Sequence, residues 1–318
     1  MRKENVAIVF PGQGSQYIGM GKDLYDNFEI ARRVFQEVDD AINQRLSELI
    51  FFGDKEVLNL TENAQPAIMA CSIAAYRILA EINGATSMSD LCRATAGHSL
   101  GEYTALCAAD ALSLADTARL LKKRGLAMQA AVPVGHGGMS ALLGVDFDTA
   151  SQIAIEAEKY GICEVANDNC TGQIVISGDI KALDYAETIA TQYGCKKAVR
   201  LPVSAPFHCA LMHPATKIME KELLNMTFSS PTVPVISNYT ARPNVSTVQI
   251  IQLLVGQIAN VVRWTESIQL MSARYNTKHF IECGPGKILS GLINRILIQV
   301  DCKQVFSSNE LRSIEKIV

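Results

Sequence analysis

The sequence predicts an α/β protein in two parts: a larger domain built on a parallel sheet, and a smaller lobe inserted into it. Three observations support this class. The apolar run Val6–Phe10 ends at Pro11-Gly12, as a buried parallel strand does. A second short strand runs into a helix at Ser99. From Gly135 onward the predicted elements follow a different order, which is that of a compact unit of its own.

The composition is that of a folded protein with a sizeable core. The chain has 318 residues, of which 48% are hydrophobic and 19% charged, so it is not disordered and is long enough for one large domain or two ordinary ones. Its net charge of -3 does not favour nucleic acid or an anionic membrane as a partner. The first apolar run is too short for a signal peptide, and no run reaches the ~18 residues of a membrane span.

The nine cysteines are scattered and form no C-x-x-C pair. Such an unpatterned, odd set, without an export signal, predicts reduced thiols and a cytoplasmic protein. Cys209 and His213 lie near His208, but their spacing is not that of zinc ligands, so we expect no metal site.

The first strand is followed by a glycine-containing loop and then by helices. In this loop, Gly12-Gln13-Gly14 lets backbone amides approach a ligand closely, so the loop is either an anion cradle or a plain turn. Helical patterns cover residues 23–49, with a break, and 65–83. Pro66 is expected at the start of the second pattern, where its missing N–H costs little.

The stretch Gly97-His98-Ser99-Leu100-Gly101 is predicted to be a nucleophile elbow. Residues 93–96 form the strand that enters it, and a helix begins near Leu100. The flanking glycines are needed because a Cβ at either position would collide with the turn. The amides after Ser99 then point at a bound group, with the positive end of the helix dipole behind them. G-x-S-x-G also occurs by chance, so the pattern alone leaves Ser99 a nucleophile or an ordinary serine.

A helix over residues 114–130, opened by Ser113 and Asp116, carries an arginine among apolar side chains. At 100° per residue, Arg124 falls in the middle of the apolar stripe. An arginine cannot lose its charge, so one that faces the interior must meet an anion. It forms an internal salt bridge, extends to the edge of the core, or holds a substrate carboxylate through two parallel hydrogen bonds.

The smaller lobe is predicted over residues 135–203, which leaves 1–134 and 204–318 for the larger domain. Its elements are strand 140–145, helix 148–160, strand 163–166, strand 173–177, helix 182–193 and strand 197–203. This βαββαβ order is that of a ferredoxin-like unit. The hairpin turn between the middle strands is expected at Asn167-Asp168-Asn169 and Thr171-Gly172.

The last third returns to the larger domain. His208 lies in a loop before a helix that begins near Pro214, and a histidine there is either a structural residue or a base. Further elements are predicted as strands 233–236 and 278–282 and a helix at 288–298.

Several motifs in one order, from about residue 5 to 310, together resemble the malonyl-CoA:acyl-carrier-protein transacylase family. They are Phe10-Pro11-Gly12-Gln13-Gly14-Ser15-Gln16, Gly97-His98-Ser99-Leu100-Gly101-Glu102, Arg124-Gly125, Phe207-His208, Arg263-Trp264 and Glu282-Cys283-Gly284-Pro285-Gly286. The resemblance implies an α/β-hydrolase-like core with a parallel sheet and an inserted ferredoxin-like small subdomain. The order of elements described above agrees with that division.

The resemblance also implies roles for individual residues. Ser99 would be the nucleophile and His208 the general base and acid. Gln257 would orient His208 through its main-chain carbonyl, in place of the aspartate of a hydrolase triad. Arg124 would hold the malonyl carboxylate.

Backbone amides of Gln13 and Leu100 would form the oxyanion hole.

Two positions depart from the usual pattern of the family. Val261 stands where proline is usual, near the position assigned to Gln257. Phe207 matches the malonyl-selecting members from polyketide synthases, whereas the stand-alone fatty-acid enzymes often have serine. Its ring would narrow the pocket and favour malonyl over methylmalonyl groups.

The implied activity is transfer of a malonyl group from malonyl-CoA to the phosphopantetheine thiol of acyl carrier protein, through a Ser99 acyl-enzyme, for fatty-acid synthesis. A trans-acting malonyltransferase of a polyketide synthase is one alternative, and a non-catalytic binding module is another. A serine hydrolase or thioesterase is the third. It would need an acid partner, and Asp168, Asp179 and Asp184 all fall in the inserted lobe.

We expect a monomer without a tightly bound cofactor, with malonyl-CoA and coenzyme A as small-molecule partners. The carrier protein is an acidic partner, so basic residues are candidates for its docking surface, although each can equally be a solvated surface charge. These candidates are Lys122, Lys123, Lys196, Lys197 and Arg200.

Overall fold

The computed structural model describes residues 1–244, 246–314 and 316–317. Its main sheet has five parallel strands in the order β10-β9-β1-β2-β7. Their bounds are β1 Val6–Phe10, β2 Ala94–Gly97, β7 Val235–Ile236, β9 His279–Cys283 and β10 Asp301–Val305. Every residue of the central strand β1 is buried, as its uninterrupted apolar sequence predicts for a strand covered on both faces. The predicted parallel sheet is therefore confirmed.

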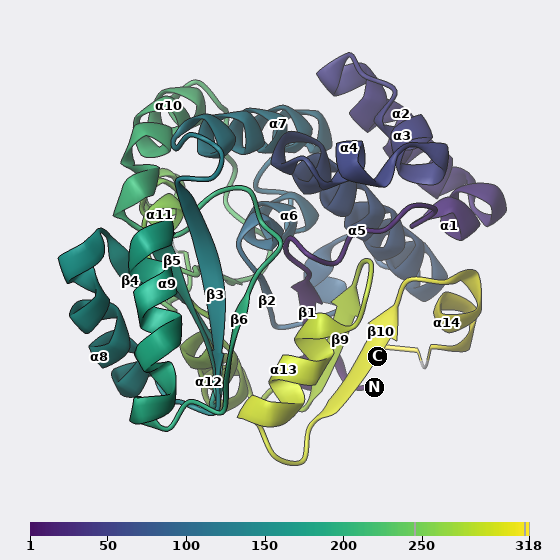
Figure 1. Cartoon of the computed structure of the whole chain (residues 1–318). Coiled ribbons are helices and arrows are strands. Elements are labelled where there is room, and N and C mark those ends of the chain that lie inside the picture. The colour runs from purple at the N-terminus through teal and green to yellow at the C-terminus, as the bar shows by residue number, and fades with distance from the viewer. Residues whose placement is uncertain (245, 315, 318) are drawn as a thin grey trace.

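Helices cover both faces of this sheet (Figure 1). On one face, Ile8 and Phe10 pack in a core formed largely by the first helices of the chain. Their bounds are α1 Lys22–Asn27, α2 Glu29–Ile42, α3 Leu46–Phe52, α4 Lys55–Asn59, α5 Thr61–Asn83, α6 Leu100–Ala108 and α7 Leu114–Ala130. On the other face, Ala7 and Val9 pack against residues of α12 (Trp264–Tyr275) and α13 (Ile288–Ile296).

The remaining helices of the larger part come late in the chain. They are α10 His213–Leu224, α11 Thr247–Ile258 and α14 Ser308–Ser313. Short 3-10 turns lie at Lys3–Asn5, Met88–Asp90, Glu158–Tyr160, Ala190–Tyr193 and Ala210–Met212. No helix of the described residues is long and apolar enough to cross a bilayer.

A second sheet forms the smaller lobe, at the left of Figure 1, with the order β6-β3-β5-β4-β8. Its elements are β3 Gly137–Leu143, α8 Phe147–Ala157, β4 Cys163–Cys170, β5 Gln173–Asp179, α9 Ile180–Ile189 and β6 Lys197–Arg200, in the predicted βαββαβ order. One face packs on α8 and α9, and the other joins the main core through Met139 and Val175. The edge strand β8 (Val262–Arg263) comes from outside residues 135–203, and the domain limits stay a prediction.

Two predicted details are wrong. Helix α5 begins at Thr61, so Pro66 lies inside the helix and not at its start. Nearly all side chains of this helix up to Leu79 are buried, and that packing outweighs the hydrogen bond that a proline removes. The hairpin turn consists of Thr171 and Gly172 alone.

The three residues before that turn, Asn167 to Asn169, belong to strand β4. Their polar side chains suggested a turn because such groups often bond to their own backbone. Here two of them have distant partners instead. Asp168 accepts a hydrogen bond from Thr265, and Asn169 contacts His98.

Candidate active site

The turn between β2 and α6 holds Ser99 in a strained conformation. Its φ of 54° and ψ of -108° are uncommon for a residue with a side chain. A Cβ on Gly97 would overlap the carbonyl oxygen of Gly101, and one on Gly101 would overlap that of Phe10. Both glycines are thus required by the close approach of backbone, and the tight turn presents the Ser99 hydroxyl.

We expect Gly101→Ala to destabilise the protein by about 2 kcal/mol or more, because the added methyl group meets the backbone of the central strand. Gly291→Ala in α13 is the matched control, since no atom lies within 4 Å of its added Cβ. There alanine should stabilise the helix by up to about 1 kcal/mol. Urea unfolding measures both variants, and equal effects would contradict the steric explanation of the elbow.

A histidine and a main-chain carbonyl stand in line with Ser99. The Ser99 Oγ lies 2.8 Å from Nε2 of His208, and Nδ1 of His208 lies 2.8 Å from the carbonyl oxygen of Gln257. A carbonyl only accepts, so Nδ1 carries the hydrogen and Nε2 is free to take the serine proton. Burial, with a smaller effect of the positive Arg124, lowers the pKa of His208 to about 3. The imidazole is therefore neutral near pH 7, as a general base must be.

Arg124 lies on the buried face of α7, beside the serine. Its side chain is 1% exposed, and its guanidinium donates to Gln65 Oε1 at 2.7 Å, Gln257 Oε1 at 2.8 Å and Ser99 Oγ at 3.1 Å. Among the described residues no carboxylate lies within 4.0 Å of it, and its Nε has no partner. Of the three predicted roles of Arg124, the internal salt bridge and the extension to the edge of the core are thus excluded by the described contacts. The arrangement leaves a buried cation that can receive an anionic group.

The two amides assigned to the oxyanion hole lie at the same turn. Leu100 is the first residue of α6, where an N–H has no carbonyl partner within the helix. The loop that carries Gln13 packs on the elbow, because a Cβ on Gly12 would lie 2.7 Å from the carbonyl oxygen of His98. The N–H of Ser99 is already bonded to Asn238. The roles of Gln13 and Leu100 stay predictions.

Three polar residues at this site had no predicted role. Asn238, just after β7, accepts from the Ser99 N–H at 2.7 Å and donates from Nδ2 to the Gly97 carbonyl at 2.8 Å. Glu102 accepts from the Asn238 N–H at 3.0 Å. Gln65 binds Arg124, as described above. Glu102 stands within the motif of the elbow, and Asn238 follows a strand of the parallel sheet, where ligand-facing polar residues gather, so both positions carried a weak signal.

Phe207 is buried directly before His208, and its effect on acyl selectivity stays a prediction.

A surface hollow reaches His208 from the side of the smaller lobe. Residues lining it include Phe147, Ile155, Val165, His208, Ala259 and Val261. The residue at the unusual position 261 thus contributes to a wall of this hollow.

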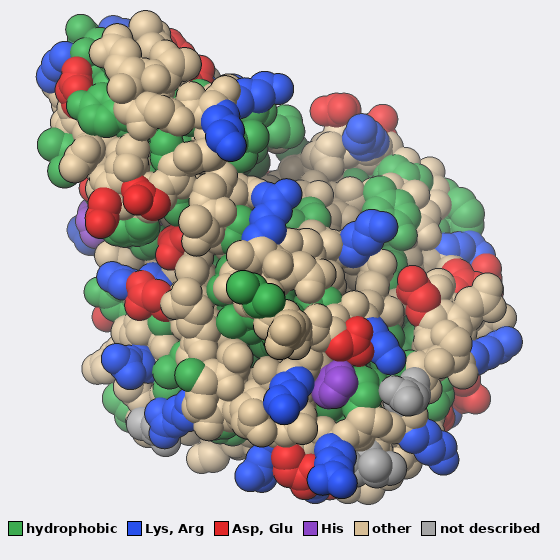
Figure 2. Space-filling model, turned by 90° about the horizontal axis from the view of Figure 1, so that it is seen from below, with side chains coloured by type: hydrophobic (Ala, Val, Ile, Leu, Met, Phe, Trp, Pro, Cys, Tyr) green, Lys and Arg blue, Asp and Glu red, His purple; other side chains and the backbone are tan. Residues whose placement is uncertain are grey.

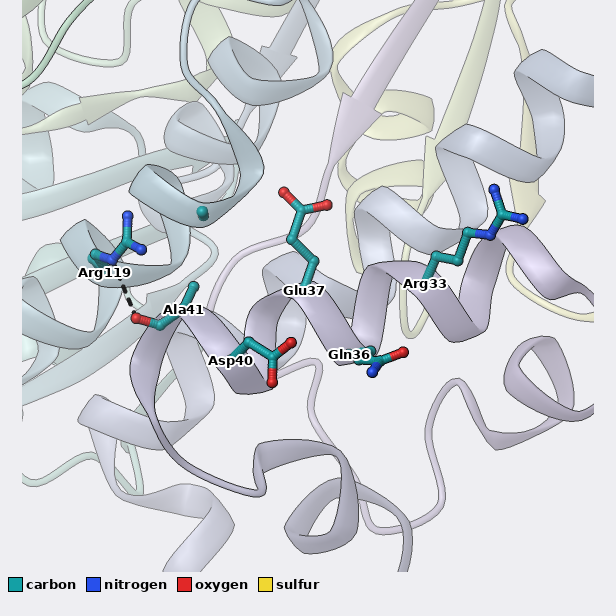
Figure 3. A pocket seen from close by; sticks show the side chains of 7 residues that line it. Arg33, Gln36, Glu37, Asp40, Ala41 and Arg119 are labelled. Atoms are coloured by element: carbon teal, nitrogen blue, oxygen red, sulfur yellow. Dashed lines mark hydrogen bonds between the residues drawn. The ribbon is translucent and has the colours of Figure 1, made fainter.

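A second hollow lies between α2 and α7 (Figure 3). Its lining includes Arg33, Gln36, Glu37, Asp40, Ala41 and Arg119. Arg119 is held there by a 3.1 Å hydrogen bond to the carbonyl oxygen of Ala41. Most of these side chains are exposed and they carry both signs of charge, so this hollow lacks the buried cation and the serine that distinguish the elbow.

The other candidate groups have partners of their own. Asp168, Asp179 and Asp184 bond to Thr265, the Ile162 amide and Arg200, and none of them bonds to His208. A hydrolase triad is thus incomplete within the described part of the chain. All nine cysteines are free, and the described residues contain no cluster of three or more histidine, cysteine or acidic side chains that could hold a metal.

The five basic residues proposed as candidates do not together mark one docking surface. Lys122, Lys123 and Arg200 already pair with carboxylates, at 3.9, 3.4 and 2.7 Å. Lys196 and Lys197 form no ion pair with any residue that the structure describes. On the face seen from below, positive and negative side chains are interspersed (Figure 2). The docking surface therefore stays a prediction.

A serine and a histidine at a strand-to-helix elbow of a parallel sheet are the arrangement found in α/β proteins that use a serine nucleophile. The acyl transferase domain family matches residues 7–305 of this chain. The malonyl CoA-acyl carrier protein transacylase of Bacillus subtilis (strain 168) is 44% identical over 292 residues, which cover 92% of this chain and 90% of that protein.

Solved structures are similar over nearly the whole chain. An acyl-carrier-protein S-malonyltransferase from Bartonella henselae is 48% identical with a TM-score of 0.94, covering 97% of this chain and 98% of that one. A malonyl-transacylase in complex with a type II PKS acyl-carrier protein is 36% identical with a TM-score of 0.93 and the same coverage. The chain belongs to the malonyl CoA-acyl carrier protein transacylase family, as its motifs predicted.

Proposed function

We propose that the protein transfers a malonyl group from malonyl-CoA to the phosphopantetheine thiol of acyl carrier protein, through an acyl-enzyme on Ser99, and so supplies fatty-acid synthesis. The observation that carries this proposal is the position of one hydroxyl between two groups. Ser99 Oγ lies 2.8 Å from Nε2 of His208 and 3.1 Å from a guanidinium nitrogen of Arg124. The first contact suits attack on a thioester, and the second suits an acyl group that carries its own carboxylate.

The reaction runs in two halves. His208 Nε2 takes the Ser99 proton while Oγ attacks the thioester carbonyl, and the amides of Gln13 and Leu100 donate to the oxyanion. Each such donor contributes on the order of 3 kcal/mol to the transition state. When the intermediate collapses, the carbon–sulfur bond breaks and His208 returns the proton to the coenzyme A thiolate. The thiol of the carrier protein then attacks the ester, with His208 accepting its proton and returning it to Ser99.

Arg124 selects the acyl group in this scheme. A malonyl carboxylate that displaces the Ser99 contact of the guanidinium would gain charge-assisted hydrogen bonds in a site shielded from water. The existing bonds to Gln65 and Gln257 hold the guanidinium in place. A neutral acetyl group would leave this buried cation without an anion.

Mass spectrometry of the protein mixed with malonyl-CoA tests the proposal. We expect one malonyl group on the peptide that contains Ser99, its release on addition of holo-acyl carrier protein, and no adduct on Ser99→Ala. Loss of the adduct to water without a carrier would support a hydrolase instead. Absence of any adduct would support a binding module.

Malonyl transfer in a polyketide pathway is the second candidate. Two observations favour it: one similar solved structure is in complex with a type II PKS acyl-carrier protein, and position 207 is phenylalanine. Transfer rates to a panel of fatty-acid and polyketide carrier proteins distinguish the two pathways. Preference for a fatty-acid carrier supports the first.

We further propose that the enzyme is a monomer of the cytoplasm with no tightly bound cofactor. Nine free cysteines, all but Cys302 buried, support a reducing compartment. Sedimentation of the purified protein measures the oligomeric state.

A further inference from the structure

Glu102, one turn beyond Ser99 in α6, is a buried carboxylate that the reaction above does not use. Its side chain is fully buried. One oxygen, Oε2, accepts two hydrogen bonds: from the Asn238 N–H at 3.0 Å and from Gln257 Nε2 at 2.7 Å. A buried carboxylate is costly unless such bonds compensate it, so its presence beside the nucleophile calls for an explanation.

Asn238 and Gln257, the two donors to Oε2, both hold the backbone of Ser99. Asn238 Oδ1 accepts from the Ser99 N–H at 2.7 Å, and Gln257 Nε2 donates to the Ser99 carbonyl at 3.0 Å. Ser99 has a positive φ of 54°, a conformation that persists only where the surroundings enforce it. The two bonds fix the peptide groups on either side of the strained residue.

Gln257 also links Glu102 to Arg124. Its Oε1 accepts from the Arg124 guanidinium at 2.8 Å, while its Nε2 faces Glu102. A side-chain amide has one donating and one accepting end, and Oε2 of Glu102 accepts in this contact. Glu102 therefore selects the orientation of the amide in which Oε1 points at Arg124. The reversed amide would place two donors against each other at the guanidinium.

We propose that Glu102 is a positioning residue, which acts through Asn238 on the Ser99 backbone and through Gln257 on both Ser99 and the Arg124 guanidinium. The part that concerns Arg124 rests on the proposed function, whereas the part that concerns Ser99 does not. Burial raises the pKa of Glu102 to about 7. Because one oxygen accepts both bonds, the contacts remain when a proton resides on the other oxygen. The reach of the side chain, more than its charge, determines the positioning.

Two substitutions separate reach from charge. Glu102→Asp keeps the carboxylate but shortens the side chain by one methylene, and Glu102→Gln keeps the reach without the charge. One readout is the rate at which a fluorophosphonate labels Ser99, which needs the serine and the histidine but no malonyl group. The other is the ratio of kcat/KM for malonyl-CoA to that for acetyl-CoA.

For Glu102→Asp we expect both quantities to fall by about tenfold or more, as for a reacting group displaced by about 1 Å. For Glu102→Gln we expect both to stay within about threefold of wild type, because its oxygen can accept the same two bonds. Thr104→Val is the matched control in the same helix. Thr104 is buried, and its hydroxyl bonds only the Leu100 carbonyl, at 3.5 Å. Melting temperatures show whether each variant is folded.

Wild-type labelling and ratio in Glu102→Asp would overturn the proposal, as would an equal loss in Glu102→Gln. Gln257→Leu removes the link to Arg124, while the main-chain carbonyl of residue 257 still contacts His208. It should lower the ratio of malonyl-CoA to acetyl-CoA kcat/KM by about tenfold. This result does not depend on whether Glu102→Asp folds. An unchanged ratio in Gln257→Leu would overturn the link. If the wild type is labelled by the fluorophosphonate but never malonylated, the proposed function is wrong. The labelling rates of the Glu102 variants then still test the effect of Glu102 on Ser99.

Discussion

His208→Ala is expected to slow malonyl transfer by about 10³-fold or more, because the variant lacks the imidazole that is proposed to take the Ser99 proton. Nε2 of this histidine lies 2.8 Å from Ser99 Oγ. A stopped-flow measurement of coenzyme A release in the first turnover follows the acylation step. Ser99→Ala should reduce that step by a similar factor, and the double variant should be little worse than either, since the two residues act as one unit. Additive losses would contradict this pairing.

The pH profile of the wild-type acylation rate tests the same role of His208 independently. Burial and the positive Arg124 lower the pKa of His208 from the ordinary 6.5 to about 3. The base is then neutral throughout pH 5 to 8, and the acylation rate should stay nearly constant over that range. A base with an ordinary pKa would be mostly protonated at pH 5, so a steep fall below pH 6.5 would contradict the assignment.

The lowered pKa of His208 also makes the free energy of unfolding depend on pH. The unfolded chain takes up a proton at His208 below pH 6.5, whereas the folded imidazole does not until about pH 3. The contribution of this residue to the free energy of unfolding is therefore complete above pH 6.5 and falls as the pH drops toward 3.

The parts of the fold that the sequence predicts correctly have local signals. Strand β1 is an uninterrupted apolar run, and helix α7 begins after Ser113, whose side chain accepts from the Asp116 N–H. Strand β8 has no such signal. The two residues of β8 pair with β4, about 95 positions away in the chain, and only tertiary packing determines that pairing. Strand β10 was missed for a similar reason, because its pattern of burial is mixed and it lies at the edge of the sheet.

Some features of the candidate active site likewise have local signals in the sequence, and others do not. The glycines around Ser99 and the position of Arg124 on its helix are local patterns, and both placements agree with the structure. The contacts of Arg124 with Gln65 and Gln257 span 59 and 133 positions, and no local spacing predicts them. A main-chain carbonyl such as that of Gln257 leaves no signature in residue type, and family resemblance alone suggested it.

Arg124→Ala is expected to lower kcat/KM for malonyl-CoA by about 10³-fold, while transfer of acetyl groups is kept or increased. Hydrogen bonds between charged groups contribute about 1.5–3 kcal/mol each, so loss of a two-bond contact with a carboxylate costs about 4 kcal/mol. The neutral acetyl group makes no such contact, and removal of an unpaired buried cation makes the pocket more suitable for it. Competition between the two thioesters, with both acyl products measured on the carrier protein, gives the ratio directly.

Two further variants show whether this selectivity depends on the shape of the guanidinium or only on its charge. Arg124→Lys keeps a cation but lacks the planar fork that binds a carboxylate through two bonds, so it should recover only part of the lost malonyl transfer. Arg119→Ala is the matched control, since this arginine lies on the same helix with an exposed side chain paired to Asp116. It should change neither rate. Equal losses of malonyl and acetyl transfer in Arg124→Ala would mean that the arginine supports the elbow and does not read the acyl group.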